Sequence, residues 1–246
     1  MSSAPHSIAF DQPIPIFPLP NTVLLPRAIL PLHLFEPRYV EMMQDTLREQ
    51  RLISMALLKP GYAEKYYTHS ATVHPVLCVG FVTKYERLRD GRYNLLLQGL
   101  CRASIRREDL EKTYRRGWLQ PLAEGQDLSE TESLAIRRQL RQAADDEVLA
   151  IASPSGILLE VIDCPHLSVS DMLDLLAFNL IKDPPARQAF LATLGVNERA
   201  DRLRSILNGL RRTVRSTRQE PGSGMFASCG VVPSRSRLHR SNPSDN

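Results

Sequence analysis

The chain has 246 residues, of which 43% are hydrophobic and 24% are charged. This balance is typical of a folded globular protein, and the length suits one large domain or two small ones. The sequence holds no apolar run that approaches the roughly 18–20 residues needed to span a bilayer. Its opening, MSSAPHSIAF, lacks a basic stretch followed by an apolar one, so we expect no secretion signal and a cytoplasmic location.

The formal net charge of +4 is concentrated at the C-terminal end. From Arg211 onward, seven arginines face only Glu220 and Asp245, so this end carries +5 and residues 1–210 carry about −1. Residues 219–246 are rich in Ser, Pro, Gly and Arg, which predicts a disordered basic tail. Such a tail can contact phosphates, but it offers only Phe226 for stacking on bases, so nucleic acid is not the favoured partner.

Residues 1–12 are expected to form a leader, and the β-rich part begins at residue 13. The four prolines within residues 14–26 predict short extended segments broken by turns, and they argue against a helix or a central strand. Glu36 and Pro37 predict the start of a helix that runs to Gln50, because proline suits the first helical position.

The following stretch, up to residue 124, has the pattern of a β-rich subdomain. Short segments rich in valine, leucine and aromatic residues are expected to be strands at 52–58, 74–88, 93–98, 101–105 and 118–122. Asp90 and Gly91 predict a tight hairpin between two of these strands. Gly99 is expected to end the return strand.

From Ser129 the apolar residues recur at helical spacing, which predicts a helical subdomain over 129–218. Ser129 and Glu132 form a capping-box pattern at the start of a helix of about 20 residues. Further helices are expected to begin at Ser168 or Ser170, at Pro184, and at Asn197, with a short apolar segment at 156–162. Strands followed by helices place the chain in the α+β class.

Several segments resemble the N-terminal domain family of Lon proteases. They are IPIFPLPNTVLLP (14–26), LPLHLFEPRY (30–39), VGFV (79–82), DGRYNLLLQG (90–99) and DMLDLLAF (171–178). The resemblance covers residues 13–212 and implies a small PUA-like β-barrel followed by a C-terminal helical bundle. The sequence departs from the family pattern at Arg27, where a glycine commonly follows the proline, so the turn there is expected to differ slightly.

Full-length Lon proteases add an ATPase and a Ser–Lys peptidase to this domain, and neither has a recognisable motif here. The sequence contains no G-x-x-x-x-G-K-[ST] phosphate-binding loop and no dinucleotide fingerprint. His74 with Cys78, and Cys164 with His166, are too few ligands for a closed zinc site. We therefore expect a non-enzymatic protein without a catalytic residue, cofactor or metal. The four cysteines include no CxxC pair, and we expect free thiols.

The resemblance implies a module that recognises unfolded or degron-bearing polypeptides, or a partner protein. Such a module needs exposed apolar surface or a free sheet edge, and two segments are candidates: the proline-rich 14–26 and the segment 30–39. In the second segment the candidate protein-binding residues are Phe35, Glu36, Arg38 and Tyr39. A structural alternative is that Phe35 and Tyr39 only staple the start of the helix. Glu36 and Arg38 are expected to be exposed, which favours an interaction role for these two.

Two other functions remain open at the level of sequence. A small-molecule site on the β-rich part would draw on histidines and a cysteine, namely His33, His69, His74 and Cys78. RNA binding would rest on the basic tail and on the likeness of a PUA-like barrel to RNA-binding modules, which is an analogy of fold only.

Overall fold

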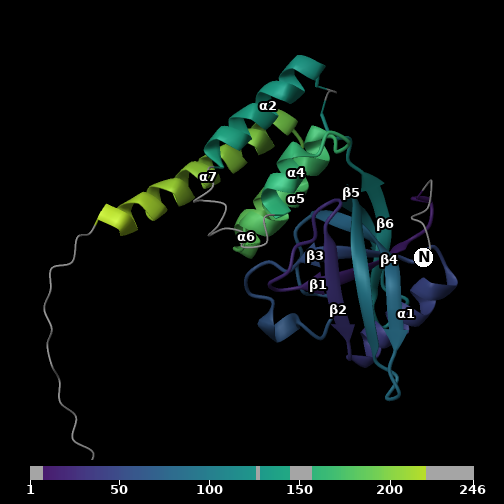
Figure 1. Cartoon of the computed structure of the whole chain (residues 1–246). Helices are drawn as coiled ribbons and strands as arrows, with labels where there is room; N and C mark the ends of the chain where they lie inside the picture. Colours follow the sequence, from purple (N-terminus) through teal and green to yellow (C-terminus); the bar gives the residue numbers. More distant parts are fainter. Residues whose placement is uncertain (1–7, 126–127, 145–156, 220–246) are drawn as a thin grey trace, which may run out of the picture.

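The computed structural model describes residues 8–125, 128–144 and 157–219, which form a β-rich part followed by a set of helices (Figure 1). The β-rich part contains β1 (Ile14–Leu19), β2 (Ile29–Leu34), α1 (Pro37–Arg48), β3 (Leu52–Leu57), the short 3-10 helix η1 (Ala63–Lys65), β4 (Val76–Arg87), β5 (Tyr93–Asp109) and β6 (Arg115–Pro121). The helical part contains α2 (Glu130–Ala143), α4 (Ile157–Asp163), α5 (Val169–Leu180), α6 (Pro184–Ala192) and α7 (Val196–Gln219). The α+β class predicted from the sequence is confirmed.

The six strands form one mixed sheet in the order β2-β5-β4-β3-β1-β6, with an additional pairing between β5 and β6. Only the β1–β3 pair is parallel, and the other pairs are antiparallel. Strand β5 is long enough to pair with β2 through its first half and with β6 through its second half. The sheet therefore closes through five strands and leaves β2 outside, so it is not the clean barrel that the resemblance implied.

Gly99 does not end a strand, as the sequence suggested, but lies inside β5 at a bulge. Opposite β4, Val79 pairs with Cys101 and Gly80 pairs with Gly99, so one residue of β5 has no partner. The Gly99 amide donates to the Ala28 carbonyl at 2.8 Å, and its own carbonyl accepts from the amide of the residue before Ala28 at 2.9 Å. A glycine is needed because a Cβ atom would collide with the Leu25 carbonyl.

The expectation that the prolines of residues 14–26 exclude a central strand is wrong. Strand β1 lies between β3 and β6, but the two ladders overlap at Ile16 only. Pro15 lies where β1 has β6 as its partner, and Pro18 lies where its partner is β3. A strand residue that pairs with only one neighbouring strand does not need an N–H donor on its other side. Pro15 and Pro18 are tolerated for this reason. Because β1 is buried, segment 14–26 is not the free edge we expected.

Two apolar clusters stabilise the sheet. The first fills the ring and takes alternate residues from all five ring strands, namely Ile14, Ile16, Leu52, Ala56, Leu77, Val79, Phe81, Ala103 and Leu119. The second lies on the outside of the ring and continues without interruption into the helices. It joins Phe17 and Met55 of the sheet with Met42 of α1, Met172 of α5 and Leu203 of α7.

In the helical part, α2 and α7 pack along each other, while α4, α5 and α6 lie nearer the sheet (Figure 1). The predicted capping box of Ser129 and Glu132 is present, and Ser168 caps α5. Asn197 does not cap the last helix, because α7 begins one residue earlier. The end of the predicted 20-residue helix lies outside the described residues, and 157–163 is a helix. None of the described helices is long and apolar enough to cross a bilayer.

A buried ionic cluster joins the sheet to the helices. Arg102 of β5 makes two bonds to Asp174 of α5, at 2.6 and 2.8 Å, and contacts Glu124 at 2.5 Å. Arg199 of α7 reaches the same two carboxylates at 3.0 and 2.9 Å. Although burial alone would raise the pKa of Glu124, the two guanidinium groups and Ser170 lower it. Burial raises the pKa of Asp174, although the same guanidinium groups act against this effect. The cluster pairs two guanidinium groups with two carboxyl groups, and it fixes α5 and α7 against β5.

Candidate functional site

The structure separates the four predicted binding residues into one exposed and three enclosed side chains. Phe35 is 62% exposed and stacks on His33, with ring centroids 6.0 Å apart. Tyr39 is buried and meets Phe17 edge to face at 4.4 Å. Since the two rings pack on different partners, they form no staple, and only Tyr39 belongs to the core.

Glu36 and Arg38 are not the exposed residues that we expected, because their side chains are only 18% and 15% exposed. Arg38 bonds to Glu36 at 2.9 Å and donates to the Tyr66 carbonyl at 3.0 Å. Its guanidinium lies 4.5, 5.0 and 5.5 Å from the rings of Tyr39, Tyr66 and Tyr67. A loop that follows β3 thus covers the start of α1, which the sequence did not indicate.

Tyr66 closes this network through its hydroxyl, which donates to Glu36 at 3.1 Å. Burial, followed by the Glu36 carboxylate, raises the pKa of Tyr66. Burial also raises the pKa of Tyr39 well above its usual range, so both hydroxyls stay protonated at neutral pH. The enclosed residues therefore hold the loop in place, while Tyr67 next to them is exposed.

An apolar surface lies around β2, and we call it the β2 surface: Ile29, Pro31, His33, Phe35 and Leu96. Ile29, Pro31 and His33 alternate with less exposed residues along β2, so they share its outer face. Pro31, His33 and Leu96 line one groove of about 450 Å³ across β2, β5 and β4, together with the polar side chains of Lys84, Glu86 and Asn94. The groove is open and mostly apolar, with charged side chains at its β4 side, which suits contact with a polypeptide segment.

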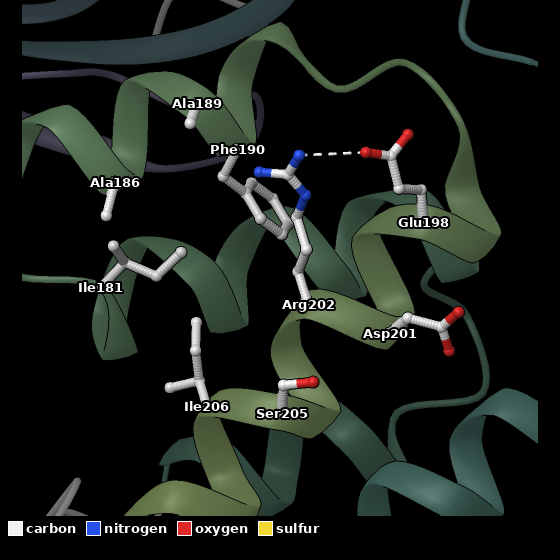
Figure 2. Close-up of a pocket in the computed structure, with 9 residues that line it drawn as sticks. All are labelled: Ile181, Ala186, Ala189, Phe190, Glu198, Asp201, Arg202, Ser205 and Ile206. Carbon is white, nitrogen blue, oxygen red and sulfur yellow. Dashed lines mark hydrogen bonds and ion pairs between the residues drawn. The ribbon is translucent and has the colours of Figure 1, made fainter.

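A second groove of about 510 Å³ lies between α6 and α7 (Figure 2). Ile181, Phe190 and Ile206 form its apolar floor, and Figure 2 shows them pointing toward one another. At its rim Arg202 bonds to Glu198 at 3.0 Å across one helical turn. Ile181 and Phe190 are already buried, so this groove offers less free apolar surface than the β2 surface.

The histidines and the cysteine considered for a small-molecule site do not come together. His33 lines the β2 groove, whereas His69 contacts the Thr113 carbonyl at 3.3 Å. Cys78 is buried in the core, and this burial raises the pKa of its thiol, so it is a poor nucleophile. Burial and Lys59 lower the pKa of His74. Within the described ranges, no three His, Cys, Asp or Glu side chains gather in a way that could hold a metal ion.

Known proteins share this fold over most of the chain. The Lon N-terminal domain protein from Xanthomonas campestris has a TM-score of 0.56 and 20% identity over 78% of this chain and 96% of that one. The N-terminal domain of Mycobacterium avium complex Lon protease has a TM-score of 0.60 and 14% identity, over 80% of this chain and 98% of that one. At these identities the structures show a common fold.

The curated relatives are much longer proteins. Lon protease of Anaeromyxobacter dehalogenans is 25% identical over 206 residues, which are 82% of this chain and 24% of the relative. Lon protease 2 of Sorangium cellulosum is 30% identical over 152 residues, which are 61% of this chain and 18% of the relative. This chain thus spans about a quarter or less of their length. The sequence model of one protein family, the ATP-dependent protease La (LON) substrate-binding domain, matches residues 13–209. The chain therefore belongs to this family.

Proposed function

We propose that this chain is a non-enzymatic module that captures unfolded polypeptides, and that the β2 surface is where they bind. The observation that carries the proposal is the gathering of exposed apolar side chains. The described part of the chain exposes six large hydrophobic residues, and two of them, Ile29 and Phe35, belong to the β2 surface. An exposed apolar patch is costly in water unless a partner covers it, so such patches mark interaction sites.

The four residues predicted from the sequence then have different roles. Phe35 would contact the client directly, because it is exposed and held in place by His33. Glu36, Arg38 and Tyr39 would act as support, because their contacts fix the loop that carries Tyr67. This assignment keeps the predicted segment as the binding region and limits the direct contact to its exposed side chain.

The family supports a polypeptide as the partner, since its model is that of a substrate-binding domain. The surface itself supports recognition of a client through its exposed apolar side chains rather than through a degron. The β2 surface has no enclosed, charged pocket that would select one sequence, and so we propose recognition of apolar segments in general. We therefore assign to this domain only the capture of the polypeptide, without ATP hydrolysis or peptide cleavage.

The test is binding to a permanently unfolded probe, reduced and carboxymethylated α-lactalbumin, followed by fluorescence anisotropy. Ile29→Ser and Phe35→Ser are each expected to weaken binding, and the double variant by about tenfold or more, because about 25 cal/mol is lost per Å² of apolar contact. Matched controls come from other surfaces: Leu134→Ser on α2, at the same 53% exposure as Ile29, and Leu110→Ser, at 64% exposure beside the 62% of Phe35.

Equal weakening by the control variants would show that binding is not located on the β2 surface. Loss only with Ala189→Asp would move the site to the α6–α7 groove, where this exposed alanine lies. If the parent protein does not bind the probe at all, the proposed function is wrong. Circular dichroism of each variant would show that the fold is intact.

A further inference from the structure

Strand β2 is the one strand of the described sheet that pairs on a single side, with β5. In an antiparallel ladder, successive residues direct their backbone N–H and C=O groups alternately toward one neighbour and the other. The Leu88 amide donates to the Arg92 carbonyl, so Arg92 faces β4 and the next residue, Tyr93, faces β2. Tyr93 pairs with Leu34, and the alternation then assigns the backbone of every residue in β2.

By this alternation, Leu30, Leu32 and Leu34 bond to β5, while Ile29, Pro31 and His33 direct their backbone groups away from the sheet. The bond from the Gly99 amide to the Ala28 carbonyl supports this assignment. Ala28 lies two residues before Leu30, so its backbone is also expected to bond to β5. Pro31 has no N–H, and at an outward position its absence costs the sheet nothing. The free edge therefore offers two donors, on Ile29 and His33, and three acceptors.

Pro31 interrupts the free edge of β2, and this interruption limits pairing between copies of the chain. A continuous free edge is a template for pairing with copies of itself, and a proline in its middle weakens that pairing. An incoming strand can still use the donors on either side of the proline and all three carbonyls. The edge is thus suited to transient pairing with an extended chain.

The charge at one end of the edge indicates what kind of chain it would accept. The β4–β5 hairpin lies next to the His33 end of β2, through the pairing of His33 with Asn94. On this hairpin Lys84, Arg87 and Arg89 are exposed and make no ion pair with any described residue, and only Glu86 offsets them. Asp90 is already bonded to Arg92 at 2.5 Å. The end of the edge near His33 is therefore positively charged.

We propose that β2 is extended by an added strand: an extended, apolar polypeptide segment flanked by acidic residues. Its backbone bonds to Ile29 and His33, its apolar side chains lie beside Ile29 and Phe35 on the outer face, and its acidic residues lie near Arg87 and Arg89. This inference rests on the proposed function and adds the conformation and the chemistry of the bound segment.

The test uses a synthetic peptide of alternating valine and threonine, preceded by two aspartates, with binding measured by fluorescence anisotropy. In an added antiparallel strand, the residues opposite Ile29, Pro31 and His33 have their side chains on the outer face and their amides directed at β2. The valines are expected to take these positions. N-methylation of the valine amides is therefore expected to weaken binding about tenfold or more, since each lost backbone bond costs roughly fivefold. N-methylation of the threonine amides, which point to solvent, is expected to leave binding within about twofold.

Variants of the protein test the same contacts from the other side. Ile29→Pro removes one outward donor and is expected to weaken binding, and the matched variant Ile29→Thr, which keeps the amide, separates this effect from the lost side chain. Arg87→Glu with Arg89→Glu is expected to favour the peptide preceded by two lysines over the one preceded by two aspartates. In the unaltered protein, amide exchange at Ile29 and His33, measured by NMR, is expected to slow when the peptide binds.

Equal effects of the two N-methylation patterns, or unchanged exchange at Ile29 and His33 in a saturated complex, would overturn strand addition. If unfolded α-lactalbumin still bound through the β2 surface under those conditions, the proposed function would stand and only the mode of binding would be wrong. A lack of preference between the aspartate and lysine peptides would overturn the assignment of acidic flanks.

Discussion

At the scale of single residues, Arg27 shows how a departure from the family pattern is accommodated. Its backbone has a φ of 65°, in the left-handed region where glycine is favoured. Arg27 thus has a backbone conformation that suits glycine, and its side chain forms an ion pair with Asp171 of α5 at 2.9 Å. The unfavourable backbone conformation is partly offset by a contact between the sheet and the helices.

This account predicts a specific order of stability at position 27. Arg27→Ala keeps the left-handed backbone and loses the ion pair, so it is expected to be less stable than the parent. Arg27→Gly loses the same pair but relieves the strain, which is worth about 1 kcal/mol. The free energy of unfolding, measured with urea, should therefore be higher for Arg27→Gly than for Arg27→Ala. The opposite order would mean that the strain is negligible.

Gly99 is expected to be among the least replaceable residues of the chain. A Cβ atom there would overlap backbone atoms of Leu25 and Pro26, which cannot move aside as a side chain can. Gly99→Ala is expected to lower the free energy of unfolding by about 3 kcal/mol. Gly91→Ala is the control, because Gly91 has a φ of 87° but no atom within 4 Å of its added Cβ. Its cost should be limited to about 1 kcal/mol of strain.

At the scale of elements, the buried cluster around Asp174 sets the position of the helices on the sheet. Removing the Asp174 carboxylate leaves the two buried guanidinium groups of Arg102 and Arg199 with Glu124 as their remaining carboxylate in the cluster. Asp174→Ala is therefore expected to cost about 3–5 kcal/mol of unfolding free energy. Asp171→Ala, three residues away on the same helix, removes only the Arg27 pair, and should cost less than about 1 kcal/mol. Similar losses in both variants would contradict a special role for the cluster.

The contact between α1 and the loop before β6 is expected to depend on pH. Burial alone would raise the pKa of Asp45 on α1, but bonds from Lys112 and Tyr114 outweigh it and lower the pKa. A carboxyl with a lowered pKa in the folded state stabilises the fold above its unfolded pKa of about 3.9, and loses this effect as the pH falls through the folded value. Asp45→Asn should therefore destabilise the protein at pH 7 and have little effect near pH 2. A constant difference in unfolding free energy between these two pH values would exclude this linkage.

A structural feature could be predicted from the sequence when the residues that form it are close together along the chain. The helix after Glu36, the hairpin at Gly91 and the cap at Ser129 follow from neighbouring residues, and the structure confirms them. The enclosure of Glu36 and Arg38 could not be predicted, because it comes from Tyr66, some 30 residues later in a loop without apolar periodicity. The tolerance of Pro18 depends likewise on the staggered ladders of β1, which only the assembled sheet shows.

At the scale of the whole molecule, the β-rich part and the helical part share one core. The larger apolar cluster includes residues of the sheet, of α1 and of the helices up to Leu207 of α7. Polar contacts run in parallel with it, such as the bond from Gln188 of α6 to the Val76 carbonyl at 2.8 Å. The division into two subdomains, 13–124 and 129–218, remains a prediction. Whether the two subdomains unfold separately can be measured.

A continuous core should make the two parts unfold together. Trp118 of β6 is the single tryptophan of the chain and lies 3.8 Å from the Arg107 guanidinium, so its fluorescence reports on the sheet. The circular dichroism of helices reports mainly on α2 to α7. In urea, the two signals are expected to change in one transition with the same midpoint. In Asp174→Ala, both midpoints should fall together if the apolar core alone couples the parts. If the helical signal falls first while Trp118 is unchanged, the ionic cluster provides the coupling, and 13–124 folds independently.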